Sequence, residues 1–253
     1  MRIWGGCATE AGAVKVINQD RILFCHRKSG GESVAVGLVS DGISRMNRGE
    51  WAAQAVRDRV YRWFCGNQKE KGEALAESLE AVFQEANAWV RRLREDGSRI
   101  RSGATLSACL LTEGICHCYQ VGDSRIYHGH SGRWEMVTED QTVLVEKGSG
   151  LKACLYNYVG KDERLYWEKT RCAVTTGDVF LFCSDGFYRT MRQEDLAWMF
   201  TSDKGLDPNA ACRSMIKKAL SRGERDNISL GFFRVEGGEP MNMEVEQSDE
   251  TEF

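Results

Sequence analysis

The chain alternates long stretches of amphipathic periodicity with short runs that are almost wholly apolar. Apolar side chains recur every three or four positions in residues 50–64 and 74–93, a spacing that predicts two successive amphipathic helices. The short apolar runs predict strands. They cover residues 33–39, 104–112, 115–121, 179–183 and 228–235.

Turn signals connect the strands in consecutive pairs. Residues 112–114 read Thr-Glu-Gly and predict a hairpin. Residues 125–128 and 134–137 lie on either side of a Ser131-Gly132 turn and continue this meander. Strands in consecutive pairs, with two helices inserted together, predict an α+β fold made of antiparallel layers.

Two further helices are predicted from their first residues. Thr190 with Gln193 resembles a capping box that opens a short helix ending at Phe200. Asp207 stands directly before a proline, which places an N-cap ahead of a proline at the first helical position. A helix over residues 210–220 is therefore expected.

The composition is that of a globular protein. The 253 residues are 42% hydrophobic and 28% charged, and a net charge of −3 argues against a general nucleic-acid binder. No apolar run reaches the length of about 18 residues that a membrane helix needs, and no signal peptide is visible. We expect one domain over residues 1–235 and a disordered acidic tail over 236–253.

The 10 cysteines are predicted to be reduced thiols in the cytoplasm, because no export signal is visible. Cys116 and Cys118 share one face of a predicted strand, and His117 lies on the other face. We expect buried strand residues there rather than a metal site. His128 and His130 flank a turn and are expected to be exposed.

One local run of positive charge stands out against the acidic balance. It comprises Arg91, Arg92, Arg94, Arg99 and Arg101. We interpret the run as a solvated helix face followed by a loop, and a local basic patch is the alternative.

An aspartate recurs at the ends of predicted strands, usually beside glycine or another small residue. The five are Asp20, Asp41, Asp123, Asp185 and Asp226. Any one of them is explained as an ordinary turn residue. Five together predict a site for hard divalent cations, which prefer carboxylate and carbonyl oxygens. Histidine is nearly absent near them, which favours Mg²⁺ or Mn²⁺ over zinc.

The segments around these aspartates resemble, in order and over most of the chain, motifs of the metal-dependent Ser/Thr protein phosphatases of the protein phosphatase 2C (PPM) family, in their bacterial single-domain form. The matching segments are Gly12-x-x-Lys15-x-x-Asn18-Gln19-Asp20, Val39-Ser40-Asp41-Gly42, Ser102-Gly103-Ala104-Thr105, Gly122-Asp123-Ser124-Arg125-x-Tyr127, Thr138-Glu139-Asp140-Gln141, Tyr158-Val159-Gly160, Ser184-Asp185-Gly186 and Asp226-Asn227-Ile228. Each segment alone is a weak signal, but their common order makes the resemblance specific.

The resemblance implies a four-layer αββα sandwich with two central antiparallel sheets and a two-metal site at one end. By this resemblance Asp41 would bridge two Mn²⁺ or Mg²⁺ ions. Asp20 and the Gly42 carbonyl would hold one ion, and Asp185 and Asp226 would hold the other.

The resemblance also implies the reaction, which is hydrolysis of phosphoserine and phosphothreonine in proteins by a hydroxide that bridges the two ions. Asp123 would contribute to a weaker third ion. Asp41 and Lys15 are the implied catalytic residues, and Lys15 would also bind the substrate phosphate. No cysteine nucleophile is expected, because no phosphoenzyme forms.

Three positions depart from the family pattern. Lys15 replaces an arginine that grips the phosphate, and lysine lacks its planar fork. Arg45 replaces part of a glycine-rich stretch and is a candidate for substrate binding. Gln141 replaces a histidine and cannot act as a general acid near neutral pH.

These departures leave an alternative open, a catalytically weak family member that serves as a phosphoprotein-binding regulatory module. A phosphatase for the antagonist of a partner-switching circuit is a second alternative. For the enzyme we expect phosphorylated proteins and a Ser/Thr kinase as partners, no nucleic acid, no membrane insertion, and a monomer.

Overall fold

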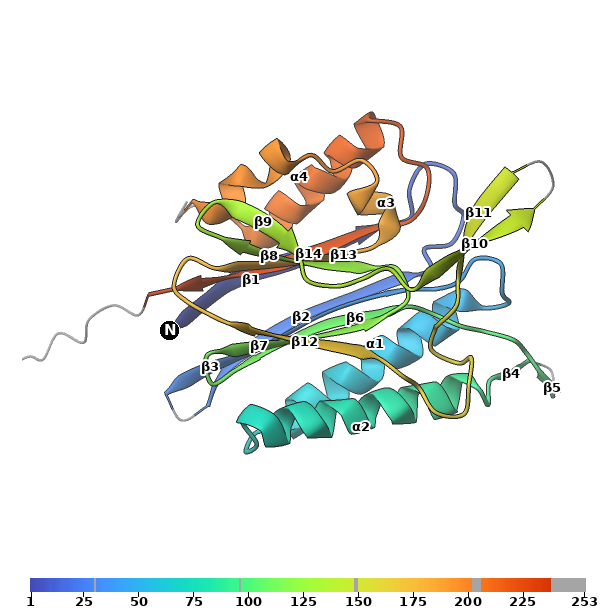
Figure 1. The fold of residues 1–253 in the computed structure, drawn as a ribbon, viewed down its shortest axis with the longest axis horizontal. Coiled ribbons are helices and arrows are strands. Elements are labelled where there is room, and N and C mark those ends of the chain that lie inside the picture. The colour runs from blue at the N-terminus through green and yellow to red at the C-terminus, as the bar shows by residue number, and fades with distance from the viewer. Residues whose placement is uncertain (30, 96, 148–149, 202–205, 238–253) are drawn as a thin grey trace, which may run out of the picture.

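Two five-stranded antiparallel sheets pack face to face (Figure 1). The first sheet has the strand order β1 (Arg2–Glu10), β14 (Ile228–Glu236), β13 (Val179–Cys183), β8 (Arg125–His130) and β9 (Arg133–Met136). The second sheet has the order β12 (Glu168–Ala173), β7 (Ile115–Val121), β6 (Leu106–Thr112), β3 (Glu32–Asp41) and β2 (Asp20–Ser29).

Helices cover the outer face of each sheet (Figure 1). Those over the second sheet are α1 (Gly49–Gly66) and α2 (Gly72–Val90), and those over the first are α3 (Asp185–Tyr188), the 3-10 helix η1 (Gln193–Phe200) and α4 (Pro208–Ser221). Val56 of α1 and Phe83 of α2 share a buried core with Leu38 of β3. The apolar stripes of both predicted helices thus face the sheet, and the four-layer αββα fold is confirmed.

This computed structural model describes residues 1–29, 31–95, 97–147, 150–201 and 206–237. The predicted acidic tail over 236–253 lies outside the described residues from position 238 on. Its first residue, Glu236, still belongs to β14.

Aromatic side chains fill the space between the two sheets. Phe180 and Phe182 of β13 and Phe233 of β14 are fully buried there. A β-carbon on Gly37 of β3 would lie 2.3 Å from the Phe182 ring, and one on Gly231 of β14 would lie 2.4 Å from it. The ring therefore needs a glycine on each side.

The predicted meander is wrong at one connection, the step from β7 to β8. The strands on either side of the Ser131-Gly132 turn, β8 and β9, pair as predicted. β6 and β7 pair as predicted, but β8 and β9 belong to the other sheet, where β8 pairs with β13. The chain crosses between the sheets at residues 122–124, and Gly122 makes the turn with a φ of 98°. An alternating pattern reports a buried face but not the sheet to which a strand belongs.

The predicted capping box at Thr190 is also wrong. The helix is a 3-10 helix that begins at Gln193, and the Arg192 N–H donates to the Asp195 carboxylate at 3.1 Å. The N-cap of α4 is confirmed, because the Asp207 carboxylate accepts hydrogen bonds from two N–H groups of the first turn.

The sequence pattern does not predict the edge elements. β1, β12 and the hairpin formed by β10 (Thr142–Lys147) and β11 (Gly150–Leu155) have few buried positions. Without one buried face they lack an apolar run that would mark them. β4 (Arg94–Glu95) and β5 (Ser98–Arg99) form a short hairpin between α2 and β6.

The cysteines are free thiols, as predicted. Cys116 and Cys118 face the core between the sheets, with their Sγ atoms 3.9 Å apart. The expectation of buried strand residues at this cluster is confirmed. In the described part of the chain, no helix is both long enough and apolar enough to cross a membrane.

The close approach of the sheets at Phe182 gives a stability prediction. We expect Gly37→Ala to lower the free energy of unfolding by about 1–3 kcal/mol, because the added methyl group overlaps the ring. Gly66→Ala is the matched control, since a methyl group at the end of α1 meets nothing within 4 Å. Chemical denaturation of both variants tests this, and equal stability would show that the ring moves aside freely.

Candidate metal centre

The five aspartates come together at one end of the sandwich. Asp20 opens β2 and pairs in register with Asp41 at the end of β3. Asp185 follows β13, Asp226 precedes β14, and Asp123 lies where the chain crosses between the sheets. All except the buried Asp20 line a cavity of about 390 Å³, and β11 contributes to its wall.

Hydrogen bonds fix the main chain on both sides of Asp41. The Thr105 hydroxyl accepts from the Asp41 N–H at 2.8 Å, and the Thr105 N–H donates to the Asp41 carbonyl at 2.8 Å. At Gly42 a β-carbon would lie 2.4 Å from the Gly49 carbonyl carbon, so only glycine fits this approach. Thr105, the last residue of the Ser-Gly-x-Thr segment, thus fixes the position of Asp41 and also lines the cavity.

Asp20 is held by the other sheet. The Ser184 hydroxyl donates to Asp20 Oδ2 at 2.7 Å, and it accepts from the Ser229 N–H at 3.0 Å. The second carboxylate oxygen, Asp20 Oδ1, is buried and has no hydrogen-bond partner. A buried carboxylate oxygen without a donor is costly unless a cation approaches it.

Asp226 is placed by the segment that carries Lys15. The Asn227 side chain accepts from the Gln19 N–H at 2.9 Å and donates to the carbonyl of Ala11 at 2.8 Å. The Lys15 ammonium then reaches Asp226 Oδ1 at 3.2 Å. Asp226 and Lys15 therefore meet at the edge of the same cavity.

Arg189 is a charged member of the centre that the sequence did not identify. Its guanidinium forms an ion pair with Asp185 and lies 3.5 Å from Asp226 Oδ2. The only sequence signal is its place four residues after Asp185, which puts both on one helix face. The ion pairs of Arg189 and Lys15 balance part of the negative charge of Asp185 and Asp226.

Burial raises the pKa values of the clustered carboxyls. The pKa of Asp41 lies well above its usual range, because the group is buried and four neighbouring aspartates repel its charge. The pKa of Asp185 is raised to about 7, chiefly by burial. Burial also raises the pKa values of Asp20 and Asp123.

The donor set fits a hard divalent cation. It consists of carboxylate oxygens with backbone carbonyls nearby, and it includes one orphaned buried oxygen on Asp20. Oxygen ligands of this kind suit Mg²⁺ and Mn²⁺ rather than soft metals. The raised pKa values show that the two cationic side chains do not fully balance the charge.

The other predicted site residues divide into one that lines the cavity and one that does not. Arg45 lines the cavity. Gln141 is buried beside it. Its side-chain Oε1 accepts from the Gly122 N–H at 3.0 Å, and its main-chain N–H donates to the Gly122 carbonyl at 2.9 Å. Gln141 thus anchors the crossing that carries Asp123.

One cysteine has a sequence context that would suit a cysteine nucleophile. Cys183 stands six positions before Arg189, which is the C-x5-R spacing of cysteine-dependent phosphatases, so spacing alone does not exclude that mechanism. The structure argues against it, because Cys183 is fully buried in the core beneath α3. Burial also raises its thiol pKa, which disfavours a thiolate nucleophile.

A second group of potential metal ligands lies away from the aspartates. His128, His130 and Asp178 are the group in the described part of the chain whose ligand atoms all lie within 4.8 Å of one another. The Asp178 carboxylate also accepts from the Thr175 N–H at 2.9 Å, so its contacts are satisfied without a metal.

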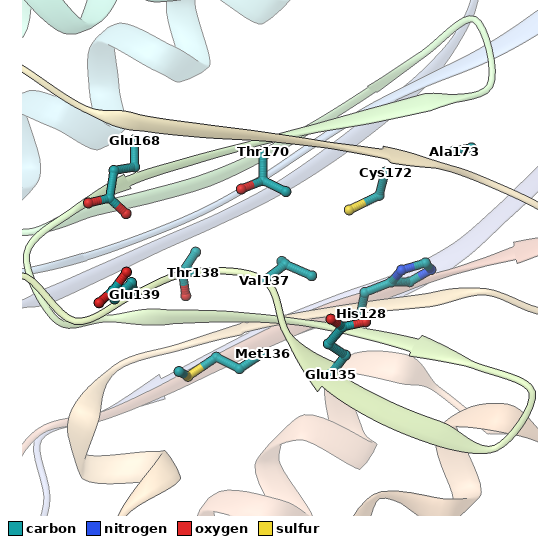
Figure 2. Close-up of a pocket in the computed structure, with 10 residues that line it drawn as sticks. All are labelled: His128, Glu135, Met136, Val137, Thr138, Glu139, Glu168, Thr170, Cys172 and Ala173. Atoms are coloured by element: carbon teal, nitrogen blue, oxygen red, sulfur yellow. The ribbon is translucent and has the colours of Figure 1, made fainter.

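The surroundings of His128 correct the expectation that it is exposed. Its ring stacks on Phe180 at 4.5 Å between ring centres and is half-buried. Of these two histidines, His130 is the exposed one. His128 lines an open groove of about 560 Å³ along the edge of the sandwich. Figure 2 shows the residues that line it. Thr170 and Cys172 of β12 form the opposite side of this groove.

The protein phosphatase 2C family model matches residues 9–225 of the chain. The chain therefore belongs to this family of phosphatases. A curated relative, the serine/threonine phosphatase stp of Listeria innocua, is 23% identical over 88% of this chain and 92% of its own length.

Solved structures show the same fold. The serine/threonine phosphatase of S. agalactiae is 21% identical and superposes with a TM-score of 0.78 over 93% of this chain and 100% of its own. The catalytic domain of the serine/threonine protein phosphatase PstP, in complex with 2 manganese ions, is 20% identical with a TM-score of 0.72, over 93% of this chain and 99% of its own.

The raised pKa values predict how stability depends on pH in chelator-treated protein. The pKa of Asp185 rises from 3.8 to about 7 on folding, so between these values the folded state holds a proton that the unfolded chain has lost. The free energy of unfolding then falls as pH rises through this window. Each kcal/mol lowers Tm by about 2–4 °C in a chain of this size.

Thermal melts in chelator from acid to neutral pH measure this effect. We expect Asp185→Asn to flatten the slope and Mn²⁺ to restore stability at neutral pH. A Tm of the chelated protein that rises with pH in this window would show that the carboxylates do not repel one another as described.

Proposed function

We propose that this protein hydrolyses phosphoserine and phosphothreonine in proteins, with Mn²⁺ or Mg²⁺ ions held by the aspartate cluster. The observation that carries the proposal is the convergence of five strand-end aspartates on one cavity with pKa values raised in four of them. Membership of the family and the printed activities of the relatives support the same reaction.

The positions of the aspartates support two neighbouring cation sites. Asp41 lies at the end of β3 and would serve both ions. Asp20, its partner in the β2–β3 ladder, would hold one ion with the Gly42 carbonyl. Asp185 and Asp226, from the first sheet, would hold the other.

Asp123 also lines the cavity and would serve a weaker third ion. Bound divalent cations would acidify a water molecule and offset the charge of the phosphoryl oxygens. Arg45 and Arg189 line the cavity, and Lys15 contacts two of its lining residues, Asp226 and Ser44. These three side chains are the ones we propose to orient the phosphate. Gln141 supplies no proton, because a carboxamide does not act as a general acid near neutral pH. Its Oε1 instead accepts a hydrogen bond from the Gly122 N–H.

A second candidate function is a catalytically weak module that binds phosphoproteins. The observation in its favour is that Lys15 and Arg189 already pair with Asp226 and Asp185, where they compete with metal ions for the carboxylates. Such a protein would bind phosphate through its cations and turn over slowly.

We further propose that the substrates are products of a Ser/Thr protein kinase in the cytoplasm. Phosphoserine and phosphothreonine in proteins are formed by such kinases, so the two activities would oppose each other. The free thiols throughout the fold support a reducing compartment.

Removal of one charge from the centre tests the metal assignment. We expect hydrolysis of p-nitrophenyl phosphate to require Mn²⁺ or Mg²⁺ and to stop with a chelator. Asp41→Asn should lower kcat/KM at least about a hundredfold, because it removes the carboxylate between the two sites. In chelator its melting temperature should not fall, since the replaced carboxyl is repelled by its neighbours.

Asp58→Asn on the surface of α1 is the matched control and should retain full activity. Near wild-type turnover of Asp41→Asn would refute the assignment. A folded wild-type protein that shows no turnover with either ion would favour the binding module.

The role of Lys15 has a test of its own. We expect Lys15→Arg to lower KM for p-nitrophenyl phosphate and Lys15→Gln to raise it several-fold, because a guanidinium fork holds phosphate better than an ammonium and an amide holds it less well. Lys28→Arg on an exposed stretch of β2 controls for a general effect of the change. Unchanged KM values would show that Lys15 serves its contacts with Asp226 and Ser44 rather than the phosphate.

A further inference from the structure

We call the cavity lined by the aspartates the acidic cavity. A second cavity adjoins it, and the charged residues that line the second cavity are basic. It measures about 380 Å³, and its charged lining residues are Arg91, Arg99, Arg101 and Lys161. Among the residues whose side chains the structure describes, no aspartate or glutamate lines it. Met46 and Tyr158 line both cavities and form the wall between them.

The cationic side chains of this basic cavity are largely unpaired. Arg91, Arg99 and Arg101 form no ion pair with a described residue, and the Arg91 Nε is buried without a hydrogen-bond partner. Lys161 lies 3.6 Å from the exposed Asp162, and Glu163 lines the adjacent surface beside Arg91. Lys161 also donates to the Tyr156 carbonyl at 2.6 Å. With respect to the described residues, donors of the three arginines therefore remain available to an anion.

The basic cavity stands on a fixed backbone. The Gly160 N–H donates to the buried Asn87 of α2 at 2.7 Å. Gly160 has a φ of 97°, and a β-carbon there would lie 2.7 Å from the Ser102 carbonyl oxygen, so only glycine allows this approach. The Asn47 N–H donates to the Arg101 carbonyl at 3.1 Å, which ties the cavity to the loop after Asp41.

We propose that the basic cavity binds a second anionic side chain, phosphorylated or acidic, of the same protein substrate whose phosphorylated residue enters the acidic cavity. The inference rests on the proposed phosphatase function. Guanidinium groups bind phosphate and carboxylate through paired, charge-assisted hydrogen bonds, and buried donors without partners gain most from such a ligand. Three members of the arginine run, Arg91, Arg99 and Arg101, would therefore contribute to substrate choice. The sequence interpretation assigns them to a solvated surface.

The chain has a net charge of −3, so its total charge does not favour the binding of anions. A local group of four cations beside the acidic cavity is then a specific feature rather than part of a general positive surface. A peptide that spans both cavities would place its phosphorylated residue and its second anion in one binding event.

The experiment compares three phosphothreonine peptides that differ at one neighbouring position. That position carries alanine, glutamate or a non-hydrolysable phosphonate analogue of phosphoserine, and its spacing from the phosphothreonine is increased one residue at a time. With the wild-type protein we expect kcat/KM to be about tenfold higher for an anionic peptide than for the alanine peptide at the best spacing, a difference of about 1.4 kcal/mol. The glutamate and phosphonate arms show which anion is preferred.

Arg99→Ala and Arg101→Glu should abolish most of this preference and leave hydrolysis of p-nitrophenyl phosphate unchanged, because that ester has no second anion. Both residues are exposed, so folding should be retained. Arg133→Ala is the matched control, because Arg133 opens β9 at the end of β8 that lies away from Asp123.

The outcomes separate the inference from the function on which it rests. Hydrolysis of p-nitrophenyl phosphate without any preference for anionic peptides overturns the inference alone. If p-nitrophenyl phosphate is not hydrolysed, the proposed function fails, and fluorescence anisotropy of the phosphonate peptide in chelator decides the inference. Loss of binding in Arg101→Glu but not in Arg133→Ala would support it. Equally tight, Arg101-dependent binding of single-stranded DNA would overturn it in favour of a general polyanion surface.

Discussion

Repulsion among carboxylates that the fold keeps together is the constraint on which the rest of the site depends. Asp20 and Asp41 face each other across the β2–β3 ladder, and Asp185 approaches from the other sheet. Each aspartate lies at or next to the end of a strand that is hydrogen-bonded within a sheet. The carboxylates therefore cannot move apart without disturbing that strand pairing. A cation is the remaining way to relieve the repulsion, which is why Lys15 and Arg189 lie among them.

The aspartate cluster contains contacts between the two sheets, as their apolar core does. Ser184, at the end of β13, holds Asp20 at the start of β2. The Phe182 ring on the same strand fits between a glycine of each sheet. The distance between the sheets therefore sets the distance between the two halves of the site, and the glycines that allow close packing also position the carboxylates.

The strongly patterned parts of the fold could be predicted from sequence. Both long helices, the buried strands and the five aspartates follow from local signals, because apolar periodicity and turn residues report burial directly. The assignment of β8 and β9 to the first sheet could not be predicted, since strand alternation does not identify the partner strand. Arg189 was missed for a related reason: its ion pair with Asp226 joins residues that are distant in sequence.

Opposite charges in adjoining cavities separate two tasks that a phosphoprotein site must perform. The acidic cavity is built from strand ends that the sheets hold in place, whereas the basic one is built from the connection between α2 and β6 and from the segment around Gly160. They share only Met46 and Tyr158 among their lining residues, so changes in the arginine run leave the aspartates untouched. If the basic cavity selects the substrate as proposed, substrate choice can vary in this fold without a change in the geometry of the carboxylates proposed to bind the metal ions.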